Sequence, residues 1–536
     1  MRPVPLIVLQ TGEPALPLTV LKPVWAETLH TVNGIPTAKI VLSVAGDPLG
    51  TLPSCDEDIA LCKPGRAVTV LLMENGVESC IFRGVIVQQT LKMRRSRVEL
   101  TLLLRHNLQK LLSTHRSQVF EQKNDAAIVS SLLLAQGIPL LGAAGMGILH
   151  EQIVQFRCAD WHFIRCRLVA NGVWLLPTPD GVSIMPPTLS AVPEHTLRQR
   201  ASLSNEDVLI EESDWSFSEL RQPAELTVAS WNDEAQTNDM ALAAVTPLGT
   251  QAFDSATGER LGATPWEFNY STPLGLEETA TLAKSLLMNL QSASARGEFV
   301  VEGSTHFQLG QTLAVEDFGL SFNGQGIITG VAQRIHKEEG WRTTLSLGTD
   351  DIVADTKTIP RVHGLHIGVV ASFVKDVSGM NRLRVSVPVL GDVNNVLWAR
   401  FASPYASNMS GFCFYPEIGD EVVVGFFDED PCYPVILGSM HNPINPAPIE
   451  PSLENNNKAL VINQDDKQLQ LSFDTLSISA QLTAAENQLT LQEGVKLEGS
   501  DTLVVKAASI SIEGEETTMS GKSVVNITGA RIDLSH

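Results

Sequence analysis

Apolar and polar residues alternate along residues 65–104. This period of two predicts paired strands, because successive side chains of a strand point to opposite faces. Asn75 and Gly76 interrupt the alternation with a dipeptide that tight hairpin turns favour. The pattern therefore predicts a β-domain in residues 1–115.

Residues 116–200 contain helical stretches in place of the alternation. Asn124 and Asp125 can cap a helix that ends at Gly137, and a second helix ends at Gly172. The following block, residues 201–355, returns to short alternating stretches around one helix. Two β-rich blocks of this kind suggest a duplicated barrel, with residues 116–200 as an α+β insertion.

Five short alternating stretches lie within residues 356–440. Five strands in so short a segment fit a small closed barrel of oligonucleotide/oligosaccharide-binding (OB) topology. The stacking aromatic residues and basic groove of a nucleic-acid-binding barrel are missing, so we do not expect nucleic acid as a partner. Residues 441–457 are rich in Pro and Asn, which predicts a stiff linker.

The last segment, residues 458–536, again alternates, with small apolar residues between Thr, Ser, Lys and Glu. Phe473 is its only aromatic residue, so the segment has too few large side chains to fill a core alone. A single copy would also leave long unpaired strand edges. We expect a trimeric β-helix or β-prism needle whose inward face is shared by three chains. A monomeric β-solenoid is the alternative.

Length, charge and cysteine content limit the number of domains, the class of partner and the compartment of assembly. The chain has 536 residues, which suggests roughly three to four domains. Its net charge of −22 disfavours binding to phosphate backbones. Seven cysteines without a CxxC pair indicate free thiols and a reducing compartment. We find no convincing signal peptide, so we expect assembly in the bacterial cytoplasm.

One stretch carries an ordered motif. WARF at 398–401 is followed by SGFCFYPEIGDEVVVGFFDEDPCYPVILGSMHNP at 410–443. It resembles the VgrG-type central spike proteins of contractile injection systems, in which a phage baseplate hub is fused to a spike. The matching residues are Trp398, Arg400, Gly411, Pro416, Ile418, Gly419, Asp420, Glu421, Val422, Val424, Phe426, Asp430, Pro431, Pro434, Ile436 and Gly438. Residues 82–88, 116–133, 155–176 and 322–348 are similar to the hub of the same family.

The resemblance implies a mainly β fold with six parts. These are hub β-barrel 1 (1–115), an α+β hub insertion (116–200), hub β-barrel 2 (201–355), an OB-fold domain (356–440), a linker (441–457) and a β-helical needle (458–536). It is most similar to the spikes of extracellular phage-tail-like particles, although a type VI secretion spike is the alternative.

The implied function is mechanical. A homotrimer would cap the hexameric inner tube, contact baseplate proteins, adapt six-fold to three-fold symmetry and pierce the target membrane on sheath contraction. It would leave the cell only as part of an extracellular or secreted particle. The resemblance also allows cargo effectors as partners. A PAAR-type tip protein would dock at the needle end, for which Ile532, Leu534 and His536 are candidates.

Other clusters could carry chemistry. Cys158, His162 and Cys166 fall at helical spacing, but a span of about 12 Å is too long for one metal ion, so we read the cysteines as facing the core. Asp428, Glu429 and Asp430 could be paired catalytic carboxylates, but they fall on a turn of the motif. We read His336, His363, His366 and His441 as loop histidines.

We therefore expect no catalytic residue, no metal site and no cofactor. Two alternatives remain: an envelope-degrading, lysozyme-like enzyme and a carbohydrate-binding module of a phage-type tail. The first needs a cleft with paired carboxylates. The second needs exposed aromatic residues on the small barrel.

Overall fold

The structure is a computed structural model. It describes residues 6–12, 16–45, 53–74, 77–94, 97–199, 207–218, 220, 222–246, 248–250, 260–319, 321–349, 358–391, 395–485, 487–492, 494–498, 501–506, 510–512 and 514–533. The chain divides into two units, Met1–Met440 and His441–His536. The predicted hairpin turn at Asn75–Gly76 lies outside the described residues.

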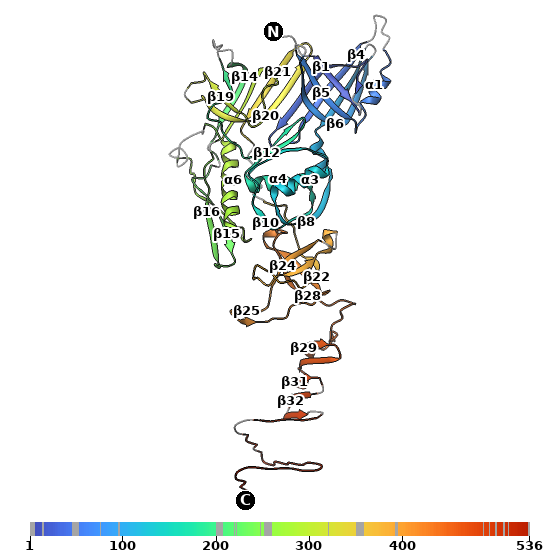
Figure 1. The fold of residues 1–536 in the computed structure, drawn as a ribbon, viewed down its shortest axis with the longest axis vertical. Helices are drawn as coiled ribbons and strands as arrows, with labels where there is room; N and C mark the ends of the chain where they lie inside the picture. Colours follow the sequence, from blue (N-terminus) through green and yellow to red (C-terminus); the bar gives the residue numbers. More distant parts are fainter. Residues whose placement is uncertain are drawn as a thin grey trace. The chain divides into compact units, whose positions relative to one another are not determined.

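A continuous sheet of thirteen strands forms the hub part of the first unit (Figure 1). In chain order these strands are β1 (Leu6–Thr11), β2 (Leu16–Pro17), β3 (Lys22–Thr31), β4 (Thr37–Ala45), β5 (Ala67–Glu74), β6 (Val77–Arg94), β7 (Arg97–Arg105), β13 (His195–Arg198), β14 (Asp207–Phe217), β18 (Ala295–Glu302), β19 (Thr312–Glu316), β20 (Gly324–His336) and β21 (Gly340–Leu347). Two short helices, α1 (Asp56–Leu61) and α2 (Lys110–Ser113), accompany the first half.

Strand β20 divides this sheet into two halves with separate cores. It pairs with β3 on one side and with β21 on the other, and its start also pairs with β19. The β19–β20 pairing closes a ring through β13, β14, β18 and β21. Ile335 packs in the core of the first half, whereas Ile328 packs in the core of the second. The two expected hub β-domains are therefore halves of one sheet, and β13 joins the second half from before residue 201.

The helical insertion follows the first half of the sheet. It contains β8 (His115–Asn124), α3 (Asp125–Ala135), β9 (Leu140–Ala143), β10 (Leu149–Ala159), α4 (Asp160–Asn171), β11 (Trp174–Thr178) and β12 (Gly181–Met185). As the sequence predicts, Asn124 caps α3 by accepting the Ala127 N–H at 2.9 Å. Gly172 ends α4 with a φ of 62°, a conformation that favours glycine.

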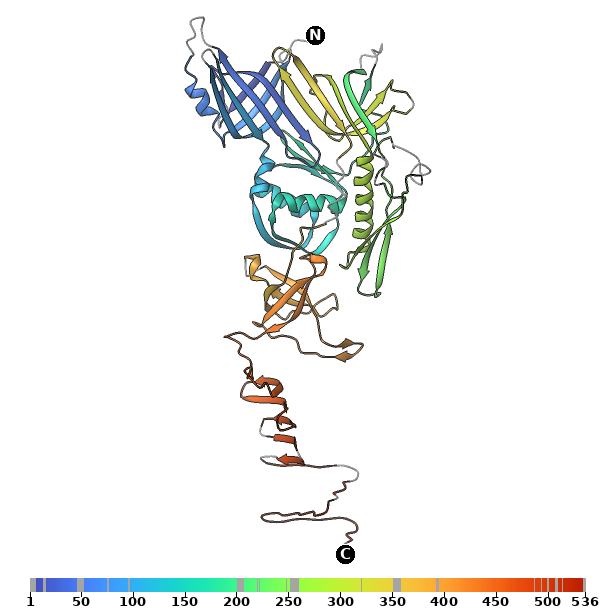
Figure 2. The same cartoon turned by 180° about the vertical axis from the view of Figure 1, so that it is seen from behind.

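A smaller sheet and the long helix α6 (Leu276–Ser294) form a further layer within the first unit (Figure 2). The sheet has the order β16 (Thr237–Leu242), β15 (Leu226–Asn232) and β17 (Trp266–Tyr270). Leu282 and Leu286 of α6 pack against Val228 of β15 in a common core. The apolar face of this amphipathic helix is thus buried against the small sheet.

The small barrel closes through five strands in the order β22 (His366–Ser372), β23 (Leu383–Ser386), β24 (Val396–Phe401), β28 (Pro434–Met440) and β27 (Glu421–Phe426). These are the five predicted strands. Alternate residues point inward: Val422 and Val424 are fully buried, and Gly368 faces them where a Cβ would lie only 2.7 Å from Val424. A two-stranded hairpin, β25 (Ala406–Ser407) with β26 (Ser410–Gly411), follows β24.

The second unit holds one antiparallel sheet in which each strand pairs with its neighbour in sequence. The strands are β29 (Asn457–Gln464), β30 (Lys467–Asp474), β31 (Ser479–Ala484), β32 (Asn487–Gln492) and β33 (Gly494–Glu498). The mainly β fold class, with its hub, helical insertion and small barrel, is confirmed. No helix of the described residues is long and apolar enough to cross a membrane.

Candidate functional site

The motif residues Pro416–Glu421 form the turn that starts strand β27. Gly419 has a φ of 93°, a conformation that favours glycine. The Asp420 carboxylate accepts the N–H of Glu417 at 2.9 Å. Backbone bonds in both directions tie this turn to Val370 of β22, at 2.8 and 3.0 Å. These residues therefore fix the corner where β22 and β27 begin to pair.

Trp398 and Arg400 of β24 face away from the barrel core. The Trp398 ring lies between the guanidinium groups of Arg382 and Arg384, whose centres are 5.3 and 5.0 Å from the ring centroid. These arginines pair with Glu151 and Glu121 of the insertion. The strand thus presents one cation–aromatic stack to the insertion.

Arg400 and Asp428 connect the barrel to the small sheet of β15–β17. Arg400 Nη1 lies 2.8 Å from Asp233 Oδ1, just after β15. The Asp428 carboxylate accepts the N–H of Ser271, just after β17, at 2.5 Å. Asp428 lies in a tight turn with a φ of 51°. The turn interpretation of the acidic run is therefore confirmed, and this carboxylate has a positioning contact.

The third acidic residue of the run, Asp430, is buried beside Pro431. Its carboxylate accepts the Cys432 N–H at 2.8 Å. Burial raises the pKa of Asp430 to about 6, although this hydrogen bond acts in the other direction.

Gly438, the last motif residue, follows a bulge in β28, since Val423 pairs with Gly438 while Val424 pairs with Ile436. The extra residue of the bulge, Leu437, is half exposed.

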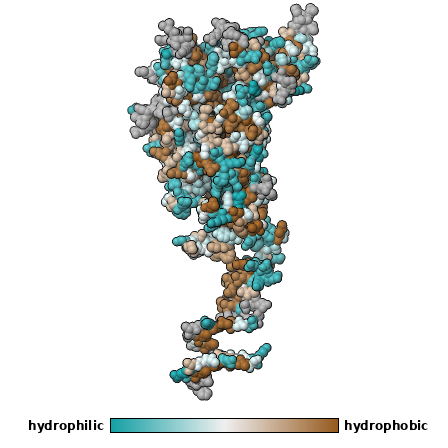
Figure 3. Space-filling view, viewed as in Figure 1, coloured by the Kyte–Doolittle hydropathy of each residue, from teal (hydrophilic) through white to brown (hydrophobic). Residues whose placement is uncertain are grey.

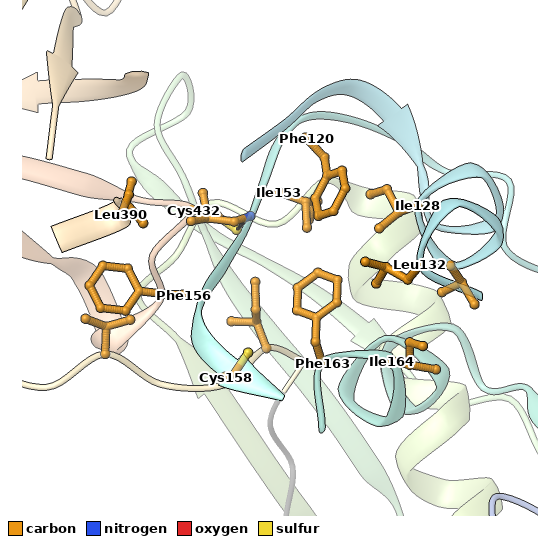
Figure 4. Close-up of a cluster of buried hydrophobic side chains, with 14 of the residues drawn as sticks. Phe120, Ile128, Leu132, Ile153, Phe156, Cys158, Phe163, Ile164, Leu390 and Cys432 are labelled. Carbon is orange, nitrogen blue, oxygen red and sulfur yellow. Dashed lines mark hydrogen bonds between the residues drawn. The ribbon is translucent and has the colours of Figure 1, made fainter. Parts of the chain in front are cut away.

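A single side chain of the insertion, Gln152 of β10, binds the backbone of two barrel segments. Its Oε1 accepts the Trp398 N–H at 3.0 Å, and its Nε2 donates to the Cys432 carbonyl at 2.7 Å. Around it, insertion residues such as Ile153 and Phe156 share a hydrophobic core with Leu390 of the barrel (Figure 4). Barrel and insertion are thus joined by one mixed core.

A buried charged network lies behind this joint. The Asp125 carboxylate, at the start of α3, receives two hydrogen bonds from Arg167 of α4, at 2.6 and 2.8 Å. Asn171 donates a third at 2.8 Å. The Arg167 guanidinium also donates to the carbonyl of Thr358, in the segment that leads into the barrel. Despite burial, Arg167 holds the pKa of Asp125 well below its usual range.

His150 extends the network to helix α6. Its Nε2 lies 3.0 Å from Asp125 and its Nδ1 lies 2.9 Å from Glu278. Burial alone would lower the pKa of His150, but hydrogen bonds to the two carboxylates raise it to about 9. Glu278 also accepts the Gly275 N–H at the start of α6. An imidazolium therefore bridges two carboxylates from different layers.

A cleft of about 1120 Å³ opens over this network, between the β15–β17 layer and the barrel. Four of the carboxylates that line it bind neighbours within the chain: Glu278 binds His150, Asp233 binds Arg400, Asp239 binds Asn232 and Asp430 binds Cys432. Among the described residues, no group of three or more His, Cys, Asp or Glu is placed to hold a metal ion. These four carboxylates of the cleft therefore hold parts of the same chain together.

The predicted Cys158, His162 and Cys166 stripe is wrong in one respect. Helix α4 begins at Asp160, so Cys158 belongs to strand β10. After a register shift between Gln155 and Cys158, Cys158 pairs with Arg116 of β8. Both cysteines are buried and His162 is exposed, so the thiols face the core as expected. Burial raises the pKa of Cys158 to about 11.

The histidines predicted for loops have mixed positions. His336 ends β20 and His366 begins β22. His366 packs its ring against Phe156 and Phe426. His363 lies in the segment before β22 and pairs with Glu429, which lies in the turn after β27. His441 directly follows β28. His366 is therefore a packing residue of the joint.

The needle sheet separates its side chains by face. On β29–β32, the middle of one face holds apolar residues in register: Leu460, Ile462, Leu469, Leu471, Phe473, Ala480, Leu482, Ala484, Leu489 and Leu491. Lys458, Gln464 and Lys467 lie on the same face at the ends of β29 and β30. The alternate residues on β30–β32 are Ser, Gln and Thr, with Asp474 at the end of β30. Leu469, Phe473 and Leu491 are each close to half exposed. This apolar face (Figure 3) is uncovered in the single chain.

A family model described as the Alg8 N-terminal domain matches residues 21–337, more than half of the chain. The chain belongs to this family. A second model, described as the type VI secretion system/phage-baseplate injector OB domain, matches residues 366–441. That match covers the strands of the small barrel. Among curated proteins, no sequence matches the chain significantly.

Solved structures agree with the VgrG-type fold. Two structures of a Francisella PdpA–VgrG complex, half-lidded and lidded, are similar over 92% of this chain, with 8% identity and TM-scores of 0.56 and 0.57. They are covered over 87% and 79% of their own chains. The E. coli c3393 protein, a type VI secretion component, covers 78% of this chain and 97% of its own, with 13% identity and a TM-score of 0.48.

The predicted VgrG-type recognition is thus confirmed, and this member of the Alg8 N-terminal domain family is related to baseplate hub and spike proteins. No observation tests the docking role of its candidate tip residues. Ile532 is about half exposed, whereas Leu534 and His536 lie outside the described residues. Their docking role stays a prediction.

The motif found in the sequence marks the barrel's corners, but it missed the residues that attach the barrel. Gln152 and Arg167 lie more than 190 residues before the segments that they bind, at Cys432 and Thr358. His150 binds Glu278 of a distant helix. Of this network, the sequence predicts only Asp125, as part of a helix cap. A charge close to apolar residues of the same helix, such as Arg167 among Phe163, Ile164 and Leu168, is the signal that the sequence offers.

Proposed function

We propose that this VgrG-type chain works as a homotrimeric spike whose needle is completed by two further copies. The observation that carries the proposal is the apolar face of the needle sheet. Fully burying one Leu, Ile or Phe side chain stabilises a fold by about 1.5–3 kcal/mol. The face offers seven exposed side chains of this size per copy: Leu460, Ile462, Leu469, Leu471, Phe473, Leu482 and Leu491.

The alternative of a monomeric β-solenoid requires the chain to cover its own apolar face. In the described residues, strands β29–β33 form a single layer in which each strand pairs only with its sequence neighbours. The apolar face therefore has no covering layer in that part of the chain. Three such layers arranged around one axis bury all three faces together and supply neighbours for the strand edges.

The hub supports the second half of the proposal. Each chain contributes two sheet halves with separate cores. Three chains would present six similar units to the hexameric inner tube at one end and a three-fold needle at the other. Baseplate proteins would contact the hub, and a PAAR-type tip protein would dock at Ile532, Leu534 and His536. Sheath contraction would drive this assembly through the target membrane.

Such a role rests on stiffness and assembly and needs no catalytic residue. The charges of the cleft support this, because its carboxylates bind other parts of the same chain. All seven cysteines are free thiols. Free thiols fit assembly in a reducing cytoplasm, followed by export as part of an extracellular or secreted particle.

The mass of the purified full chain tests the proposal. Light scattering on a size-exclusion column should give three times the chain mass, and the trimer should persist in SDS at room temperature and dissociate only on heating. Electron microscopy should show a three-fold hub with a thin needle. A stable, soluble monomer at micromolar concentration would contradict the proposal.

A further inference from the structure

One segment of the small barrel exposes apolar side chains that its own chain leaves uncovered. Residues 402–415, here called the arm, run from the end of β24 through the β25–β26 hairpin. Every residue from Pro404 to Tyr415 is exposed, and the side chain of Met409 at the hairpin tip is 99% exposed. Figures 1 and 2 both show this hairpin projecting from the barrel.

The arm is ordered by its own hydrogen bonds. The Phe412 N–H donates to the Tyr405 carbonyl at 2.9 Å, and Ser403 Oγ donates to the Phe412 carbonyl at 2.9 Å. At its base, Tyr415 packs against Phe401 of β24, with ring centroids 5.7 Å apart. A hairpin fixed in this way loses little conformational freedom on binding.

The composition of the arm indicates a protein partner with an apolar surface. Its fourteen residues include Tyr405, Met409, Phe412, Phe414 and Tyr415 but no charged residue, in a chain with a net charge of −22. Interface cores are enriched in aromatic residues and Met and are depleted of charge. The partner surface must therefore be exposed, apolar and uncharged.

The same barrel has such a surface on its outer wall, here called the barrel patch: Leu365, Ile367 and Leu437. Ile367 lies on β22, and Leu437 protrudes from β28 at the bulge. Gly425 of β27 lies buried beneath Leu365 and Leu437, since a Cβ there would lie 3.4 Å from Leu365 and 3.6 Å from Leu437. All three side chains are at least half exposed.

We propose that the arm of each copy docks on the barrel patch of the next copy, so that the three small barrels form a closed ring. This inference rests on the proposed trimer and names the contact that forms it. Arm and patch are different surfaces of one domain, so their contact is head-to-tail. Copies joined by a head-to-tail contact form a closed ring when the rotation from one copy to the next is a whole fraction of a full turn. In a ring of three copies, every arm is docked and every barrel patch is covered.

The occupant is a further copy because the chain already needs copies a short distance downstream. Sixteen residues separate the end of the barrel at Met440 from the start of the needle sheet at Asn457. Neighbouring chains held together along that sheet keep their barrels within reach of one another. An arm that served another protein would leave the barrel patch uncovered in the trimer.

Thiol chemistry tests this contact directly, because the arm contains the exposed cysteine Cys413. The Leu437→Cys variant places a second thiol on the barrel patch. A short bismaleimide should then link Cys413 of one copy to residue 437 of the next and give covalent dimers and trimers on a denaturing gel. Wild type and the double variant Leu437→Cys with Cys413→Ser should give none.

A matched control uses Val377→Cys, which adds an exposed thiol in the turn between β22 and β23. It should not cross-link to the arm. Cross-links between wild-type chains through Cys413 would show that arms meet one another and would overturn the proposal. So would equal cross-linking of the Val377→Cys and Leu437→Cys variants.

A second measurement needs no variant. A maleimide should label the Cys413 thiol at least ten-fold more slowly in the native trimer than in the chain unfolded in denaturant. Rapid labelling in a particle whose mass is that of a trimer would overturn arm docking while leaving the proposed function intact. A monomeric mass would instead contradict the proposed function itself, so the two failures are distinguishable.

Discussion

The small barrel and the needle sheet are both five-stranded and both alternate apolar with polar residues, yet they treat their apolar faces differently. In the barrel, Val422 and Val424 are fully buried, since β22 pairs with β27 and β24 pairs with β28 to close the sheet on itself. In the needle, Leu469 and Leu491 stay close to half exposed on an open layer. The same pattern therefore yields a self-sufficient core in one unit and an uncovered face in the other.

The difference teaches that alternation specifies which face is apolar but not what covers it. Closure of the barrel depends on long-range pairings and on inward glycines such as Gly368, which leaves room for Val385 and Val424. Residues 458–536 contain no aromatic residue except Phe473 to fill a core of their own. Four experiments can break or sharpen this contrast.

The largest effect is expected from a charge on the needle's apolar face. Leu471→Asp places a carboxylate between Leu460 and Leu482, its cross-strand neighbours. A buried, unpaired carboxylate is strongly unfavourable, so the chain should become monomeric by light scattering. Gln470→Asp, one residue earlier on the polar face, is the matched control and should remain trimeric. Equal masses for the two variants would refute the idea that the apolar face makes the trimer.

The next effect concerns how the barrel is attached. Arg167→Met leaves the Asp125 carboxylate buried without its partner, which should lower the free energy of unfolding of the first unit by about 3–5 kcal/mol. Denaturant unfolding followed by tryptophan fluorescence measures this. Arg165→Met, two residues earlier on α4, should change it by less than about 1 kcal/mol. The trimer mass should not change, because the needle holds the copies together.

Removing apolar volume from the barrel tests its self-sufficiency. Ile436 is fully buried in β28, so Ile436→Ala should cost about 2–5 kcal/mol of unfolding free energy. Val435→Ala, its half-buried neighbour on the outer face, should cost clearly less. Both proteins should keep the SDS-resistant needle. Dissociation of the Ile436→Ala trimer would show that barrel and needle do not stabilise themselves independently.

The smallest effect is a pH dependence at His150. Because its pKa rises from 6.5 unfolded to about 9 folded, the contribution of His150 to stability is fully present below pH 6.5 and is lost as the pH rises through 9. The melting temperature should therefore fall between pH 7 and 9.5. His150→Gln should flatten this fall, although Asp125, Glu278 and Arg167 still face the site. A parallel fall in both proteins would assign the effect to other groups.

Most individual elements follow from the sequence. The five barrel strands, the cap at Asn124 and the helix end at Gly172 are all present as predicted, because they depend on local alternation and on local backbone conformation. Cys158 is an exception. A helical spacing predicts that it shares a helix with Cys166, but the chain bulges at β10 and the helix begins only at Asp160.

The sequence by itself determined which residues pair into strands, which face of each strand is apolar and where the motif corners of the barrel lie. The tertiary structure alone decided that the two hub halves share strand β20, that Gln152 binds the backbone at Trp398 and Cys432, and that His150 bridges Asp125 and Glu278. The physical reason is separation along the chain. Alternation and caps act over a few residues, whereas these contacts join segments that only the folded layers bring within hydrogen-bond distance.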